Sequence, residues 1–168
     1  MLQNNIIKVA KETISNEARA IEELINLLDQ DFTAAVEHIY NAKGRVIITG
    51  IGKSAIIATK IVATLNSTGT PAIFMHAADA IHGDLGTIQQ DDVVICISKS
   101  GNTPEIKVLV PLIKNFKNTL IAITGNKDSF LGKQSDYVLN AYVEKEACPN
   151  NLAPTTSTTA QLVMGDAL

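Results

Sequence analysis

Five short apolar runs, each followed by small or polar residues and then by a helix-like stretch, constrain the fold of this chain more than any other feature. The runs are RVIITG, PAIFM, DVVICIS, TLIAITG and DYVLNAYV, at residues 45–50, 71–75, 92–98, 119–125 and 136–143. Short runs that are apolar at consecutive positions are typical of strands buried on both faces of a parallel sheet. We therefore expect an α/β fold: a doubly wound, five-stranded parallel sheet with helices on both faces.

The stretches between and after these runs predict the crossover helices. Periodicity indicates helices over about residues 53–66 and 103–115, with short helices near Asp79 and Ser129 and a final helix that starts among residues 155–159. In a doubly wound sheet, ligands bind outside the carboxyl ends of the strands, where the strand order reverses. Residues that follow the strands are therefore the first candidates for a site.

Two more helices are predicted before the first strand, a long one and a shorter one over about residues 31–42. Ile7, Ile14, Ile21 and Leu28 recur every seven residues and form an apolar stripe on the long helix. Either the core of the same chain or a second subunit covers this stripe, and both interpretations stay open. With no linker or repeat in view, we expect one domain over residues 1–168, with a helical segment at about residues 1–42.

Composition excludes several classes of protein. The chain has 168 residues, 46% of them hydrophobic, and a net charge of -3, so it carries no global positive field for nucleic acid. It lacks both the roughly 18-residue apolar stretch of a membrane helix and the start of a signal peptide. Two cysteines are too few for a disulfide framework. We expect a cytoplasmic protein without a membrane or nucleic-acid partner.

The segment SKSGNTPE, which follows the third run, carries the sharpest signal. Small hydroxyl residues cluster here at a helix start, where free backbone N–H groups and the helix dipole favour an anion. One capping residue would satisfy a helix start. The excess of hydroxyls therefore predicts a phosphate site, made by Ser98, Ser100, Gly101, Asn102 and Thr103.

The loop GIGKSA, which follows the first run, is tested against two known motifs. A Walker A loop needs a glycine where Ile47 stands, and a dinucleotide site needs an acidic residue after the second strand, where Met75 and His76 stand instead. The loop is thus predicted to serve the same anion site, through Gly52, Lys53 and Ser54. No cofactor is expected.

Two carboxylates follow strands and are candidates for acid–base work. Glu105 lies in the first turn of the third crossover helix, and Glu146 follows the last strand. A partly desolvated carboxylate near a phosphate is expected to have a raised pKa, which would make it a proton acceptor near neutral pH. For Glu105, a plain interaction with the helix dipole is an equal alternative. His82 is a candidate for a substrate or interface contact, and no ligand spacing in the chain predicts a metal site.

Together these loops resemble the sugar isomerase (SIS) family, and within it the arabinose-5-phosphate isomerase branch. The matching stretches span about residues 45–168 and are GIGKSAIIATKIVATLNSTGTPAIFMH, AIHGDLGTI, ISKSGNTPEI, LIAITGN, VEKEACPNNLAPTTSTTA and MGDAL. The resemblance implies a flavodoxin-like SIS fold and the interconversion of arabinose 5-phosphate and ribulose 5-phosphate. That reaction leads to 3-deoxy-manno-octulosonate for lipopolysaccharide or capsule.

Carried over by position, the resemblance also implies residue roles. Ser98, Ser100 and Thr103 would hold the phosphate with help from Ser54, and His82 would lie near the substrate. Polar residues implicated in isomerisation are matched by Lys53, Glu105 and Glu146. A homodimer or homotetramer is implied, and a nucleotide sugar of the same pathway is a further candidate ligand.

Two alternatives remain beside this function. SIS modules also occur as non-catalytic sugar-phosphate-binding regulators, and other SIS isomerases act on different sugar phosphates. The family pattern usually continues beyond residues 164–168 with a helix and a His-Pro-Gly segment, often followed by paired CBS domains. The distal histidine and CBS domains have no counterpart in these residues.

Overall fold

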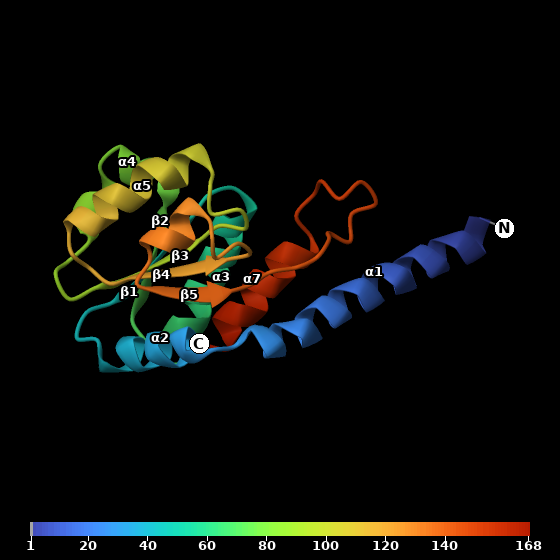
Figure 1. Ribbon diagram of the computed structural model, residues 1–168, viewed down its shortest axis with the longest axis horizontal. Helices are drawn as coiled ribbons and strands as arrows, with labels where there is room; N and C mark the ends of the chain where they lie inside the picture. The colour runs from blue at the N-terminus through green and yellow to red at the C-terminus, as the bar shows by residue number, and fades with distance from the viewer. Residues whose placement is uncertain (1) are drawn as a thin grey trace.

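The computed structural model describes residues 2–168, and helices alternate with strands over most of this length (Figure 1). The helices are α1 (Leu2–Leu24), α2 (Gln30–Asn41), α3 (Lys53–Ser67), α4 (Ala77–Ile81), α5 (Pro104–Asn115), α6 (Phe130–Gln134) and α7 (Thr156–Asp166), with short 3-10 turns η1 (Ile25–Leu27) and η2 (Asp84–Thr87). The strands are β1 (Val46–Gly50), β2 (Ala72–His76), β3 (Val93–Ile97), β4 (Leu120–Thr124) and β5 (Tyr137–Asn140).

All five strands pair in parallel in the order β2-β1-β3-β4-β5. The predicted doubly wound parallel sheet is thereby confirmed. Because β2 is added on one side of β1 and β3 on the other, the chain changes direction between β1 and β3. This reversal places the loops after β1 and β3 on either side of one crevice at the carboxyl edge of the sheet.

Two apolar cores, one on each face of the sheet, explain why the strands are apolar at consecutive positions. Ile48 and Ile95 belong to the core that α3 and α7 cover, whereas Ile47 and Val94 belong to the core beneath α4 and α5. Figure 1 shows α4 and α5 together above the sheet, apart from α3 and α7. Alternate side chains of one strand thus enter opposite cores, as the sequence pattern requires.

The last strand is shorter than predicted. The run at residues 136–143 is apolar to its end, but β5 stops at Asn140. Ala141 and Val143 are still buried in the core on the α7 side. Their apolar character reflects packing of an irregular segment, which turns the chain towards α7.

Helix α1 extends away from the sheet as an arm (Figure 1). Only its carboxyl-terminal part contacts the body, where Leu24 is buried in the core with α7. Three stripe residues stay exposed in this chain: Ile7 at 57%, Ile14 at 70% and Leu28 at 46%. The core of the same chain therefore leaves most of the predicted stripe uncovered, and of its four residues only Ile21 is half-buried. No helix among residues 2–168 is long and apolar enough to span a membrane.

Candidate functional site

A cleft of about 180 Å³ opens at the carboxyl edge of the sheet, between the loops that follow β1 and β3 and the start of α7. We call it the strand-end cleft. Its lining brings together parts of the chain that are far apart in sequence: Ile51, Lys53, Ser54, Ser98, Lys99, Ser100, Thr103, Pro154, Ser157, Thr158 and Gln161. The predicted loops after β1 and β3 thus lie on one cleft.

The serine loop, which we define as residues 98–103, is shaped by its own polar contacts. Ser98 Oγ accepts a hydrogen bond from the Gly101 amide at 3.1 Å, and Ser100 Oγ accepts one from the Asn102 amide at 3.2 Å. In these bonds the hydroxyls act as acceptors, so each keeps a proton that can be donated to a ligand. The Asn102 carboxamide oxygen accepts from the Phe130 amide at 3.0 Å and fixes the outer part of the loop.

Gly101 is required by the geometry of this loop. Its φ of 63° lies in the left-handed region that favours glycine. A Cβ atom at this position would approach Ser129 Oγ to 2.1 Å. Glycine is thus needed here both for the close approach to Ser129 and for the backbone conformation of the turn.

Thr103 has an unusual hydroxyl. It is the N-cap residue of α5, yet its side chain makes no capping hydrogen bond. The Oγ1 atom is buried and has no hydrogen-bond partner among the described residues. Such an atom is costly unless a ligand or water satisfies it. The plain N-cap interpretation therefore fails for this side chain, and an anion in the cleft would give it a partner.

Three helix N-termini meet at the strand-end cleft. Its lining includes the first residues of α3, the N-cap of α5 and the first turn of α7. Unpaired amides and the aligned dipoles favour an anion at each of these ends. Lys53 and Lys99 add two positive charges to the same lining.

The loop after β1 leads to the cleft, and it has one partner that the sequence did not indicate. Gly52 is the N-cap of α3 with a φ of 59°, and Lys53 then begins the helix at the cleft. Ser54 Oγ donates a hydrogen bond to Gln161 Oε1 at 3.1 Å. Gln161 is buried, with 1% exposure, so this bond joins α3 to α7 across the cleft.

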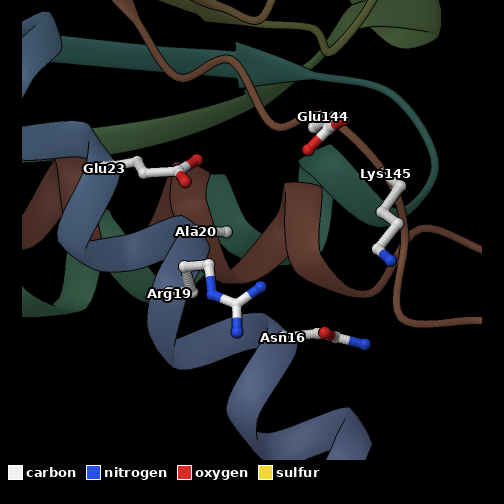
Figure 2. A pocket seen from close by; sticks show the side chains of 6 residues that line it. All are labelled: Asn16, Arg19, Ala20, Glu23, Glu144 and Lys145. Carbon is white, nitrogen blue, oxygen red and sulfur yellow. The ribbon is translucent and has the colours of Figure 1, made fainter.

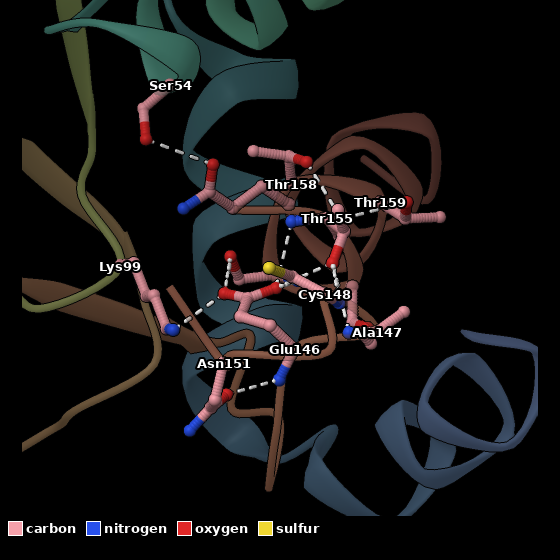
Figure 3. Close-up of polar contacts among 12 residues, drawn as sticks. Ser54, Lys99, Glu146, Ala147, Cys148, Asn151, Thr155, Thr158 and Thr159 are labelled. Carbon is pink, nitrogen blue, oxygen red and sulfur yellow. Dashed lines mark hydrogen bonds and ion pairs between the residues drawn. The ribbon is translucent and has the colours of Figure 1, made fainter. Parts of the chain in front are cut away.

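Glu146 lies behind the cleft, where five donors surround its carboxylate (Figure 3). Lys99 Nζ lies 2.6 Å from Oε1, and Ser157 Oγ donates to the same oxygen at 2.5 Å. Oε2 accepts from the Ser157 amide at 3.1 Å and from the Thr155 amide and hydroxyl at 2.8 and 3.2 Å. The carboxylate therefore caps the start of α7 and holds Lys99.

The expected raised pKa is wrong for Glu146. Burial raises its pKa, but hydrogen bonds from Lys99, Ser157 and the Thr155 amide outweigh burial and lower the pKa to about 2. The side chain is only 1% exposed, but both oxygens of its carboxylate accept hydrogen bonds from several donors. In this arrangement Glu146 is an anion that organises the site, with little capacity to accept a proton.

The other two predicted site residues lie outside the lining of the strand-end cleft. Glu105 is half-buried in the first turn of α5, two residues after Thr103, and it is not among the residues that line the cleft. His82 is exposed at the end of α4, and no contact places it at the cleft. Their functional roles remain predictions.

A second, much smaller cleft lies between α1 and the segment after β5 (Figure 2). Its volume is about 40 Å³, and it is lined by Asn16, Arg19, Ala20, Glu23, Glu144 and Lys145. Glu144 thus belongs to the junction with the arm, whereas Glu146, two residues later, faces inward. Among residues 2–168, no cluster of three His, Cys, Asp or Glu side chains has the arrangement of a metal site.

Sequence reasoning missed four polar residues of the cleft lining: Lys99, Ser157, Thr158 and Gln161. Lys99 stands between two serines that were identified, but its partner Glu146 is 47 residues away. The hydroxyls of α7 gave a signal, since serines and threonines at a helix start are typical caps. Nothing in the sequence indicated that they face Glu146 and the cleft.

Comparison with known proteins agrees with this geometry. Residues 38–168 match the family model of the SIS domain. The chain belongs to the SIS domain family. A "probable arabinose 5-phosphate isomerase" of Haemophilus influenzae is 48% identical over 98% of the chain, and an "arabinose 5-phosphate isomerase KdsD" of Pseudomonas aeruginosa is 51% identical over 100%. These matches cover 49% and 52% of the two relatives, so the chain spans about half of their length.

A solved structure is similar over nearly the whole SIS chain. A protein of E. coli CFT073, solved in complex with arabinose 5-phosphate, superimposes with a TM-score of 0.95 at 41% identity, over 99% of this chain and 89% of that one. The fold is therefore that of the SIS sugar isomerases.

Proposed function

We propose that this SIS domain is an aldose–ketose isomerase that interconverts arabinose 5-phosphate and ribulose 5-phosphate. The observation that carries the proposal is the strand-end cleft, where a buried Thr103 hydroxyl lacks a partner among the described residues, beside three helix N-termini and two lysines. This arrangement suits a dianionic phosphate. The names of the similar proteins supply the sugar and the reaction, which the cleft alone does not define.

The phosphate would anchor the substrate. Ser98 and Ser100 keep hydroxyl protons to donate, Thr103 gains its missing partner, and Ser54 lies on the opposite wall. Binding energy from the phosphate, which does not react, holds the reacting carbons in position and thereby lowers the barrier. No cofactor is needed for this reaction.

The chemistry requires opening of the sugar ring, removal of a proton from carbon 2 and return of a proton to carbon 1 through an enediol. Lys53, at the mouth of the cleft, would stabilise the negative enediolate oxygen. Glu105 and Glu146 are the candidates for moving the protons. Glu105 follows the serine loop by two residues, and Glu146 forms an ion pair with Lys99 of that loop. Glu146 would have to lose a donor before it could accept a proton.

Two measurements test these assignments. The Ser100→Ala/Thr103→Ala double variant should bind arabinose 5-phosphate at least about tenfold more weakly, since it loses two hydrogen bonds to a charged group. Unchanged affinity and turnover would remove the serine loop from the site. Exchange of the carbon 2 proton with solvent deuterium, followed by NMR, should slow in Glu146→Gln or in Glu105→Gln. Exchange at the rate of the unmodified chain excludes the replaced carboxylate as the base.

One observation favours a non-catalytic, ligand-binding role as the second candidate. Glu146 already has five donors, so the described state contains an anion site without a ready base. A regulatory SIS module would need only the anion site. Incubation of the chain with arabinose 5-phosphate and assay of the ketose separates the two, and isomerisation of a hexulose phosphate instead would indicate a different SIS isomerase.

We also propose a cytoplasmic location and assembly into a homodimer or homotetramer. Both cysteines are free thiols, which suits a reducing compartment. The exposed Ile7 and Ile14 on the α1 arm would be covered by a second copy of the chain. Sedimentation of a strictly monomeric, fully active chain would overturn this assembly. A nucleotide sugar of the pathway remains a candidate ligand, to be tested by calorimetry.

A further inference from the structure

Lys99 is the one residue of the serine loop with a positive charge, and its side chain is shared between two places. It lines the strand-end cleft, and its ammonium group pairs with Glu146 behind the cleft. The side chain is 47% exposed, whereas Glu146 is 1% exposed. The lysine, unlike the carboxylate, can therefore reorient through solvent.

The backbone of Lys99 is fixed, so any movement is confined to the side chain. Its carbonyl accepts from the Gly125 amide at 3.0 Å and from Thr124 Oγ1 at 3.3 Å. These bonds tie the serine loop to the end of β4. A rigid backbone with a half-exposed, flexible side chain lets the ammonium group change partners without disturbing the loop.

Glu146 would remain held without Lys99. Four donors other than the lysine reach its two oxygens: the amides and hydroxyls of Thr155 and Ser157. Because these donors satisfy both oxygens, release of the lysine leaves the carboxylate hydrogen-bonded. The ion pair is therefore the exchangeable part of this cluster.

We propose, on the basis of the proposed function, that Lys99 is a phosphate-binding residue that leaves Glu146 for the phosphate of the ligand. A phosphate dianion in the serine loop carries more negative charge than one carboxylate, and it lies in the part of the cleft that the lysine already lines. Until a ligand binds, Glu146 pairs with the lysine. Ligand binding then breaks one ion pair and forms another.

This exchange has a consequence for the chemistry. Once Lys99 leaves, burial of Glu146 is opposed by fewer donors, so the pKa of its carboxyl rises from the low value it has while the ion pair is intact. The phosphate would in this way convert an organising anion into a better proton acceptor. The base would become available only when a substrate is present.

The test measures binding of inorganic phosphate by calorimetry, in alkaline low-salt buffer where phosphate is a dianion. Lys99→Met should weaken binding by about tenfold, the value of one hydrogen bond to a charged group. Lys99→Arg, which keeps the charge, should restore most of the affinity. The matched control is Lys43→Met, which removes an exposed lysine before β1, at the opposite edge of the sheet, and should leave the affinity unchanged.

Glu146→Gln gives an effect of opposite sign. If Glu146 competes with phosphate for Lys99, its neutral replacement should tighten phosphate binding by roughly two- to tenfold, because the lysine no longer has to leave a carboxylate. A Glu146 that only supports the loop would instead weaken binding when replaced. Circular dichroism and thermal unfolding show whether each variant is folded. If Glu146→Gln does not fold, the comparison of phosphate affinity between Lys99→Arg and Lys99→Met tests the proposal in its place.

The outcomes are distinguishable from failure of the proposed function. If the unmodified chain does not bind phosphate, the anion site itself is wrong. If it binds phosphate and Lys99→Met binds equally well, or if folded Glu146→Gln binds more weakly, the anion site stands and the exchange of Lys99 is overturned.

Discussion

Thr103 and Glu146 are polar groups beside the same cleft, and the fold satisfies them to opposite degrees. The Thr103 hydroxyl is buried without a partner among the described residues, whereas the Glu146 carboxylate has five donors on two oxygens. A buried polar group without a hydrogen-bond partner favours binding of a ligand, whereas one whose hydrogen bonds are all made favours a rigid structure. The difference suggests that the serine loop binds, while the Glu146 cluster keeps the walls of the cleft in place.

The largest expected effect comes from removing the organising carboxylate. Glu146→Leu leaves the donors of Thr155 and Ser157 without their acceptor in a buried place, so the free energy of unfolding should fall by about 4 kcal/mol. Urea denaturation measures this change. Glu144→Leu, at an exposed position two residues earlier, should change it by about 0.5 kcal/mol or less. Equal losses in the two variants would contradict the organising role of Glu146.

The contrast also predicts a pH dependence of stability. The pKa of Glu146 is about 2 in the folded chain, below its ordinary value of 4.5, so its contribution is complete above pH 4.5 and is lost as the pH falls towards 2. This contribution is about 3 kcal/mol. The carboxyls of Asp29 and Asp92 also have lowered pKa values, so other groups add to the acid loss.

Urea denaturation at several pH values between 7 and 3 isolates the share of Glu146. The unmodified chain should lose more stability over this range than Glu146→Leu, because the variant no longer has this carboxyl, whereas Asp29 and Asp92 act in both. Parallel pH curves for the two proteins would show that Glu146 is not the depressed group.

The same contrast explains how far the sequence predicts this molecule. Local patterns were sufficient for the sheet, because each apolar run lies between two helical layers. They also indicated where the serine loop lies, because hydroxyls, Gly101 and a helix start are adjacent in the chain. The end of β5 was misplaced because Ala141 and Val143 are buried without being in a strand. A short buried segment and a short paired strand have the same apolar pattern in the sequence.

Glu146 shows where such reasoning fails. Its low pKa depends on Lys99, which is 47 residues away, and on Ser157, which is 11 residues away across an irregular segment. Desolvation can be expected from an apolar setting, but the donors that oppose it come from tertiary structure. The direction of the pKa shift therefore follows only from the folded arrangement.

The smallest expected effect on stability concerns the unmet hydroxyl, and a second such group provides the control. Thr49 Oγ1 in β1 is also buried without a partner in the part of the chain that the structure describes, but Thr49 does not line the strand-end cleft. Valine has nearly the same shape as threonine and lacks the hydroxyl. Thr103→Val and Thr49→Val should therefore each leave the free energy of unfolding unchanged or raise it by up to about 1 kcal/mol.

Binding of phosphate separates these two otherwise similar changes. Thr103→Val should weaken phosphate binding by about tenfold, since one donor to a charged group is lost, whereas Thr49→Val should bind as the unmodified chain does. Calorimetry and urea denaturation on the same samples provide both values. If Thr103→Val lost stability and kept its affinity for phosphate, the Thr103 hydroxyl would have a structural partner in solution. Thr103 would then no longer differ from Glu146 in lacking a hydrogen-bond partner.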